Sequence, residues 1–433
     1  MSAEVRTQKD LSTRVRDTAL AVEAAAERIS RSVITSPLHI SERLSSRTGA
    51  EVYLKREDLQ SVRSYKIRGA FNFMLQLSGP ERAAGVVCAS AGNHAQGVAR
   101  ACNELDITGR IFVPKTTPRQ KIDRIRHFGG EDVTVVVEGS TYDDASNLAK
   151  RYAADTGALL VSAFDDPRTI AGQGTVMAEI AAQLPTRPDY VIVPVGGGGL
   201  LSGMSAYAAQ NMPGTTVIGV EPAGAASMLA AFAAGEPVTM DEIDTFADGT
   251  AVRRAGDRTF AILHDLGVDV RATAEGAAAT EMLDLYQIDG IIAEPSGALA
   301  AASVGPVGSG AVVEVEPGST VVCVVSGGNN DISRYPEVLE RSLVHEGLKH
   351  YFIVNFPQEP GALRRFLDEV LGPDDDIALF EYVKRSNRET GPAFVGITLG
   401  AAEDLPALLR RMAESPLEIE KVEQDSPLFR MLA

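Results

Sequence analysis

The amino-acid sequence predicts an α/β protein, built from two open α/β lobes and a smaller ferredoxin-like domain at its C-terminal end. Three observations lead to this fold class. Short apolar runs alternate with amphipathic stretches up to about residue 330, which is typical of βαβ units around a buried parallel sheet. Three of these apolar runs continue directly into glycine-rich turns. The remaining segment instead shows the element order βαββαβ.

The first segment, Met1–Ser30, is charged and helix-like, and it lacks the apolar core of a signal peptide. The strands expected after it are Gly85–Ala89, Gly109–Val113, Val133–Val137, Leu159–Ser162, Tyr190–Val195, Val217–Glu221 and Thr320–Val325. The first, fifth and seventh of them end in the glycine-rich turns. Because ligands of open α/β sheets gather at the carboxyl ends of strands, these turns predict one composite pocket.

The C-terminal segment has its own succession of elements. We expect, in order, strand His350–Phe356, a turn at Pro360-Gly361, helix Ala362–Leu371, strands Ile377–Arg385 and Phe394–Leu399, helix Leu405–Met412 and strand Glu418–Val422. The glycine-turn pattern stops within Ile332–Leu348. The expected organisation is therefore a two-lobed domain over 1–335, with the smaller lobe at roughly 65–165, a linker over 336–348, and a second domain over 349–423.

Composition narrows the classes of partner. A formal net charge of −17 argues against nucleic acid and anionic membranes as partners, because both require basic patches. The three cysteines fit no disulfide or metal spacing, and the six histidines form no ligand cluster, so we expect no metal site. No apolar stretch approaches the length of a membrane span, and a cytoplasmic location is expected.

Four consecutive glycines, Gly196, Gly197, Gly198 and Gly199, follow an apolar strand and precede the small-residue helix Leu200–Gln210. Without Cβ atoms, successive backbone N–H groups can converge on a phosphate at the positive end of a helix. A plain strand-to-helix turn needs fewer glycines. A dinucleotide-binding motif would need Gly or Ala at its third glycine position. That position holds Leu201 if the motif starts at Gly196 and Ser202 if it starts at Gly197, so the motif is absent, although Glu221 lies where a ribose-binding acid would be expected. A Walker loop fails as well, because no Gly-Lys-Ser/Thr is near.

Lys66 offers a different use for a phosphate loop. The chain has no lysine between Arg151 and Leu348, the stretch that contains the four glycines. A pyridoxal phosphate site requires one lysine from elsewhere in the sequence, which forms a Schiff base with the cofactor. Arg63 and Arg68 flank Lys66, and cationic neighbours would lower the pKa of its amine and favour a nucleophilic role. A solvated surface lysine is the alternative.

Two further turns carry candidate site residues. The turn of Ser90, Ala91, Gly92, Asn93 and His94 offers backbone donors for a substrate carboxylate and the Asn93 amide for a ring oxygen, although an ordinary loop would look similar. Ser326, after a strand and before Gly327-Gly328, can donate a hydroxyl hydrogen bond to a pyridine nitrogen. Serine in a turn is common, so this signal is weak by itself.

Taken together, the motifs resemble the threonine dehydratase (threonine ammonia-lyase) family of fold-type II pyridoxal phosphate enzymes. They occur in order between about residues 35 and 335: Ser64-Tyr65-Lys66-Ile67-Arg68-Gly69-Ala70, Ala89-Ser90-Ala91-Gly92-Asn93-His94-Ala95-Gln96-Gly97, Pro194-Val195-Gly196-Gly197-Gly198-Gly199-Leu200, Glu294-Pro295-Ser296-Gly297-Ala298 and Ser326-Gly327-Gly328-Asn329. The tail around Phe352–Leu363 resembles the ACT-like regulatory module of the biosynthetic members.

The resemblance implies a role for each position. Lys66 would hold pyridoxal 5'-phosphate through the Schiff base, Asn93 would bond its 3-hydroxyl, and Ser326 its pyridine nitrogen. The phosphate would lie on Gly196, Gly197, Gly198, Gly199 and Leu200, and the substrate on Ser90, Ala91, Gly92, Asn93 and His94. It further implies a homotetramer that converts L-threonine to 2-oxobutanoate and ammonia, the first step of isoleucine biosynthesis, under feedback by L-isoleucine.

Several alternatives remain open at this point. Glu294 either protonates the departing hydroxyl, a role the cofactor phosphate could also fill, or is structural in the Pro295 turn. L-serine dehydratase, threonine synthase and cysteine synthase share the fold, and a non-catalytic amino-acid sensor would use only the tail. Ala91 stands where related serine racemases carry a serine base, which favours dehydration over racemisation. The tail has room for one regulatory module, whereas the longest biosynthetic enzymes carry two.

Overall fold

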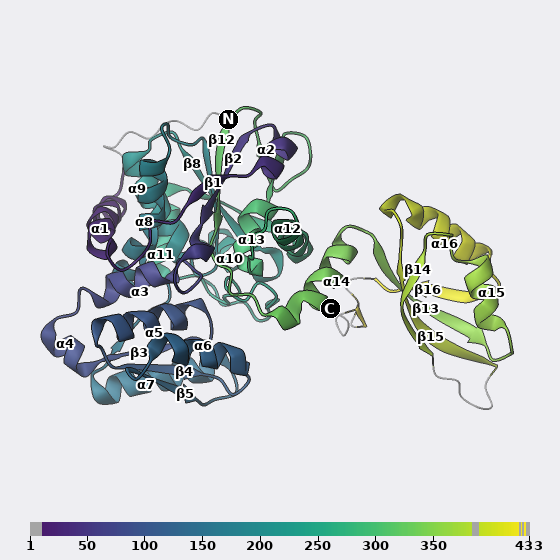
Figure 1. Ribbon diagram of the computed structural model, residues 1–433, viewed down its shortest axis with the longest axis horizontal. Coiled ribbons are helices and arrows are strands. Elements are labelled where there is room, and N and C mark those ends of the chain that lie inside the picture. The colour runs from purple at the N-terminus through teal and green to yellow at the C-terminus, as the bar shows by residue number, and fades with distance from the viewer. Residues whose placement is uncertain (1–10, 383–388, 424–425, 427, 430–433) are drawn as a thin grey trace. The chain divides into compact units, whose positions relative to one another are not determined.

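The computed structural model describes residues 11–382, 389–423, 426 and 428–429 (Figure 1). It divides into two compact units, one ending at Asn330 and one beginning at Asp331. Two of the expected elements extend beyond the described residues: residues 1–10 of the N-terminal segment and residues 383–385 of the strand expected at Ile377–Arg385.

The first unit contains every element up to β12. Its helices are α1 (Thr13–Ile29), α2 (Glu42–Thr48), α3 (Lys66–Met74), α4 (Gly79–Ala84), α5 (Asn93–Leu105), α6 (Arg119–Gly129), α7 (Tyr142–Thr156), α8 (Pro167–Gln183), α9 (Gly199–Asn211), α10 (Ser227–Ala234), α11 (Asp257–Leu266), α12 (Glu275–Gln287) and α13 (Pro295–Ala302). Its strands are β1 (Leu38–Ile40), β2 (Glu51–Arg56), β3 (Val86–Ala89), β4 (Gly109–Val113), β5 (Val133–Val137), β6 (Leu159–Leu160), β7 (Tyr190–Pro194), β8 (Thr216–Pro222), β9 (Asp269–Thr273), β10 (Val304–Pro306), β11 (Val313–Val315) and β12 (Thr320–Val325).

These strands form two main sheets, one for each lobe. The larger sheet has the order β1-β2-β12-β7-β8-β9, and only its edge pair β1–β2 is antiparallel. The smaller sheet, β5-β4-β3-β6, is parallel throughout. In Figure 1, α8 and α9 lie on one side of the larger sheet and α12 and α13 on the other. The arrangement confirms the predicted α/β class with two open lobes.

All seven strands expected in this unit are present, and β4, β5 and β12 have the expected bounds. The sequence analysis missed β2 and β9 and the short β1, β10 and β11. Strand β2 escaped because its sequence, Glu-Val-Tyr-Leu-Lys-Arg, has charged residues at both ends. Lys55 and Arg56 are nevertheless buried, because Glu179 and Asp58 pair with them. A charge that finds a partner inside the fold cannot be distinguished locally from a solvated one.

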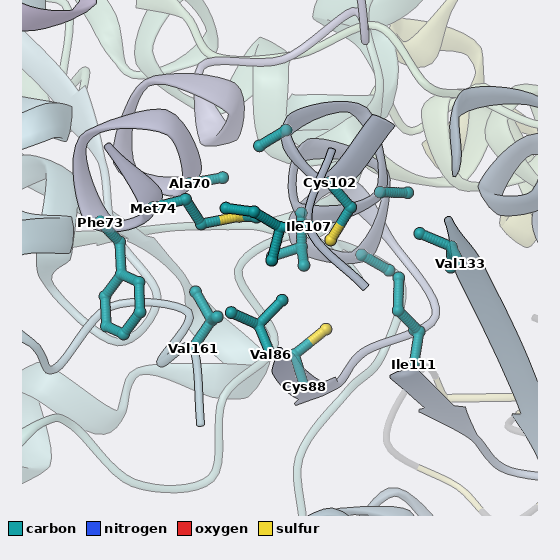
Figure 2. Packing of buried hydrophobic residues seen from close by; sticks show 14 of the residues in the cluster. Ala70, Phe73, Met74, Val86, Cys88, Cys102, Ile107, Ile111, Val133 and Val161 are labelled. Carbon is teal, nitrogen blue, oxygen red and sulfur yellow. The ribbon is translucent and has the colours of Figure 1, made fainter. Parts of the chain in front are cut away.

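The core of the smaller lobe lies between its sheet and helices α3, α5 and α6. Figure 2 shows side chains of α3, including Phe73 and Met74, packed toward Val86 and Cys88 of β3. All three cysteines of the chain are buried, and burial raises the pKa of the Cys88 thiol to about 12. They therefore act as small apolar core residues. Helix α3 is anchored by this core, which fixes the position of its first residue, Lys66.

In the second unit, a 3-10 helix, η4 (Ile332–Arg334), precedes α14 (Tyr335–His345), and α14 occupies most of the segment expected to be a linker. The elements that follow are β13 (Lys349–Pro357), α15 (Ala362–Glu369), β14 (Asp376–Tyr382), β15 (Thr390–Thr398), α16 (Leu405–Glu414) and β16 (Glu418–Lys421). The sheet order β14-β15-β13-β16, antiparallel throughout, is that of a ferredoxin-like βαββαβ domain. Phe352, Phe356 and Phe366 are central to its core.

Within the part of the chain that the structure describes, no helix combines the length and apolarity needed to cross a membrane.

Candidate active site

A cavity of about 850 Å³ lies in the first unit, where strands β3 and β7 end and helix α3 begins. Its wall contains most of the residues that the sequence analysis selected: Lys66, Ser90, Ala91, Gly92, Asn93, His94, Gly196, Gly197, Gly198, Gly199 and Leu200. The structure thus brings together three segments that are far apart in the sequence, as expected for ligand sites at the carboxyl ends of parallel strands.

Lys66 is the first residue of α3, and its Nζ donates a hydrogen bond to the carbonyl of Ala163 at 3.2 Å. Its backbone is tightly held. A Cβ on Gly97 of α5 would lie 3.2 Å from the Lys66 carbonyl, so a glycine there lets the two helices approach closely. The amide of Tyr65 donates to the carbonyl of Ser326 at 3.1 Å, which ties the start of α3 to the end of β12.

Arg68 does not supply the free positive charge that the sequence suggested for the neighbourhood of Lys66. Its side chain is fully buried and donates to Glu57 at 2.7 and 2.8 Å and to Glu179 at 2.7 and 2.9 Å. Two carboxylates therefore compensate its charge, and Glu179 also binds Lys55 at 2.6 Å. The network instead joins α3 to α8 and to the end of β2, and so fixes the helix that carries Lys66.

The four glycines form a narrow loop between β7 and α9. Gly198 has φ +90°, in the left-handed region. A Cβ on Gly197 would lie 2.3 Å from the ring of Phe164, and Thr259 Oγ1 donates to the Gly197 carbonyl at 2.6 Å. Helix α9 has no side-chain cap, so its first N–H groups are available to a ligand. Neighbouring atoms leave no space for side chains on this loop, and its free backbone N–H groups can donate hydrogen bonds to a phosphate.

The turn Ser90–Asn93 joins β3 to α5. The amide of Gly92 donates to Ser90 Oγ at 3.2 Å, and α5 also begins without a side-chain cap. Its N-terminus therefore offers backbone donors to an anionic group such as a carboxylate.

His94 is buried in the same wall, with Nε2 2.9 Å from the Val161 carbonyl. Burial, and secondarily the charge of Lys66, lowers the pKa of His94 to about 4. The imidazole is therefore neutral near pH 7. Its Nδ1 has no hydrogen-bond partner among the described residues. It contributes a neutral polar edge to the cavity.

Glu294, which the sequence left open between two roles, lines the cavity at the start of α13 and is 4% exposed. Its side chain does not cap α13; Oε1 instead accepts a hydrogen bond from Asn93 Nδ2 at 2.6 Å. Burial, and secondarily the charge of Asp248, raises the pKa of Glu294 to about 7.

Ser326 is the one selected residue that the structure does not place in the cavity wall. Its buried hydroxyl donates to the carbonyl of Ser296 at 3.3 Å. A role toward a ring nitrogen would require the hydroxyl to turn away from Ser296.

The sequence analysis gave no role to Phe164, Asn329 or the pair Lys121–Asp248, which all line the cavity. Lys121 Nζ lies 2.6 Å from Asp248 Oδ2, and this ion pair joins α6 of the smaller lobe to the loop before α11. The two residues are 127 positions apart, and no local pattern connects them.

A glycine loop, a lysine at a helix start and two α/β lobes are the features expected of a pyridoxal-phosphate dependent enzyme. The profile of the family described as pyridoxal-phosphate dependent enzyme matches residues 29–327, and that of the C-terminal regulatory domain of threonine dehydratase matches residues 340–432. The chain belongs to this family, and within it to the biosynthetic L-threonine dehydratases. The resemblance seen in the sequence motifs is confirmed.

Relatives cover nearly the whole chain. It is 60% identical over 413 residues to the biosynthetic L-threonine dehydratase IlvA of Mycobacterium tuberculosis, with 95% of each chain covered. Identity to the enzyme of the same name from Bacillus subtilis is 49%, covering 92% of this chain and 94% of the relative.

Among solved structures, a processed threonine deaminase isoform 2 from Solanum lycopersicum has a TM-score of 0.70 and 39% identity, covering 77% of this chain and 89% of that one. Maize serine racemase has a TM-score of 0.68 and 32% identity, and the match covers 76% of this chain and 98% of the racemase.

Proposed function

We propose that this protein is a threonine ammonia-lyase that converts L-threonine into 2-oxobutanoate and ammonia, and that L-isoleucine regulates it through the second unit. Membership of the biosynthetic L-threonine dehydratases makes the chain a pyridoxal phosphate enzyme with a regulatory domain. The observation that carries the proposal for the site is the cavity in which Lys66 and the glycine loop meet.

When bound, the cofactor supplies an electron sink for the pair left by the α-proton. The protein's own groups do the rest. Lys66 would hold the cofactor through its Nζ, and the same amine would serve as the general base for the α-proton of the substrate. The uncapped start of α9 would hold the phosphate, and the uncapped start of α5 would orient the substrate carboxylate. The β-hydroxyl would leave with a proton as water, and the enamine that remains would be hydrolysed by water to 2-oxobutanoate and ammonia.

Ala91 supports elimination over racemisation. Two-faced proton transfer needs a second group that holds a proton on the side of the substrate opposite Lys66, and a methyl group cannot do so. The chain lies at 32% identity to maize serine racemase, well below its 60% identity to the dehydratase of Mycobacterium tuberculosis. L-serine is expected to be a poorer alternative substrate.

For regulation, we propose a coupling free energy between isoleucine bound to the second unit and threonine bound in the cavity. Such coupling is reciprocal, so threonine should weaken isoleucine binding by the same factor by which isoleucine weakens threonine binding. The homotetramer and the cytoplasmic location that the resemblance implies belong to this proposal as well.

The test is 2-oxobutanoate release from L-threonine by the purified protein, titrated with L-isoleucine. Release that isoleucine suppresses, together with loss of at least about 1,000-fold in the Lys66→Ala variant, is the expected result. Release that persists at the normal rate in Lys66→Ala would refute the mechanism. Release that isoleucine leaves unchanged would refute the regulatory part alone, and formation of a β-replacement product from serine and sulfide would indicate a different member of the fold.

A further inference from the structure

The wall of the cavity contains a buried carboxyl, Glu294, to which the reaction described above assigns no step. The charged groups that act on it, Asp248 and Lys121, pair with each other at 2.6 Å. The carboxyl occupies space that a side chain at position 327 would need, because a Cβ on Gly327 would lie 2.3 Å from Glu294 Oε1. Any other residue at position 327 would displace Glu294 from its place.

Glu294 is one of two groups that hold the side-chain amide of Asn93. Asn93 Nδ2 donates to Glu294 Oε1 at 2.6 Å, and Asn93 Oδ1 accepts from Asn329 Nδ2 at 2.7 Å. Asn329 is itself fixed, since it donates to the Val62 carbonyl at 2.8 Å and accepts from Arg124 at 3.2 Å. A donor at one end and an acceptor at the other allow only one orientation of the Asn93 amide.

An asparagine amide carries two N–H groups, and Glu294 engages one of them. The second remains for a ligand, because Asn93 lines the cavity. We propose that Glu294 is a positioning residue, whose carboxyl holds the Asn93 amide so that its second N–H is available to an oxygen of the pyridoxal phosphate ring. The inference rests on the proposed function, which puts that cofactor in this cavity.

The proposal requires an acceptor oxygen at position 294, and a negative charge is not required. Both the ionised and the protonated carboxyl offer such an oxygen, and so does the amide of glutamine. Alanine offers none and leaves an N–H of the half-buried Asn93 without its acceptor. The loss of a hydrogen bond that leaves its remaining partner unsatisfied corresponds to about 10- to 100-fold in an equilibrium constant.

The experiment measures the cofactor rather than turnover. Each holoenzyme is dialysed to equilibrium against known concentrations of pyridoxal phosphate, and the bound fraction and the position of its absorption band are recorded. Glu294→Ala is expected to weaken cofactor binding by about 10-fold or more and to shift the band, whereas Glu294→Gln should stay within about 3-fold of the wild type with an unshifted band. Thermal unfolding of both variants checks that they fold.

Two further comparisons isolate the role of Asn93. In the double variant Glu294→Ala, Asn93→Ala, binding should be no weaker than in Asn93→Ala alone, because Glu294 acts through that amide. The matched control is Glu221→Gln, which removes another buried carboxyl whose pKa burial raises to about 7. Glu221 accepts from the amides of Met228 and Leu229 outside the cavity wall, so cofactor binding should not change.

Three outcomes would overturn the proposal: wild-type binding in Glu294→Ala, equal losses in the glutamine and alanine variants, or additive losses in the double variant. A wild-type protein that binds no pyridoxal phosphate would instead overturn the proposed function itself. The two failures are therefore distinguishable.

Discussion

Removal of the Arg68 guanidinium tests how the helix that carries Lys66 is held. The buried network contains two cations, Lys55 and Arg68, and two carboxylates, Glu57 and Glu179. Burial alone would raise the pKa of Glu57, but Arg68, Lys55 and a hydrogen bond from Ser36 hold it below its ordinary value. In Arg68→Met, Lys55 still compensates Glu179 at 2.6 Å, while Glu57 loses its bidentate partner.

A buried charge left without its partner costs about 3–5 kcal/mol, a large part of the 5–15 kcal/mol that typically stabilises a folded protein. The assay is urea unfolding of the holoenzyme, followed through the absorbance of the bound cofactor, which reports on the first unit alone. With a slope near 3 kcal/mol per molar urea, the midpoint should fall by about 1 M or more.

The double variant Arg68→Met, Glu57→Met removes one charge of each sign and should recover most of the loss, because the remaining pair, Lys55 and Glu179, is balanced. An exposed pair is the control. Arg254 and Asp257 are 43% and 67% exposed, and Arg254→Ala should cost less than about 1 kcal/mol. The reasoning is refuted if Arg68→Met also costs less than about 1 kcal/mol, or if the double variant is no better than the single one.

Two other predictions concern the cavity wall. The pKa of His94 is about 4 in the folded protein, compared with an ordinary value of 6.5. Between these pH values, His94 is therefore protonated in the unfolded chain and neutral in the folded protein. The free energy of unfolding should therefore fall as the pH is lowered through this window, by up to roughly 3 kcal/mol at about 1.36 kcal/mol per pH unit. The measurement is the unfolding free energy of the wild type and of His94→Gln at pH 7 and pH 4.5. The fall between the two pH values should be smaller in His94→Gln than in the wild type. Gly197→Ala should weaken pyridoxal phosphate binding by about 10-fold or more, because its Cβ would meet the Phe164 ring at 2.3 Å. In the same dialysis assay Gly79→Ala, whose Cβ would meet no atom within 4 Å, should bind the cofactor like the wild type.

The local sequence was sufficient for seven of the twelve strands of the first unit and for the class of cofactor. Apolar runs of strand length and the glycine turns after them gave all seven expected strands of the first unit and the βαββαβ order of the second. Spacing excluded a dinucleotide loop, and the lysine-free stretch around Gly196–Gly199 pointed to Lys66. These inferences depend on periodicity and on backbone freedom, which are properties of neighbouring residues.

Only the tertiary structure decided which polar groups meet. Arg68 pairs with Glu179, 111 positions away, instead of acting on Lys66, and Asn93 binds Glu294, 201 positions away. Ser326 donates to Ser296 rather than into the cavity. A buried charge or amide must find a partner of opposite character, and which partner is within reach depends on how distant helices and strands pack. The sequence shows which polar and charged side chains are present, whereas the packing of helices and strands determines which of them pair.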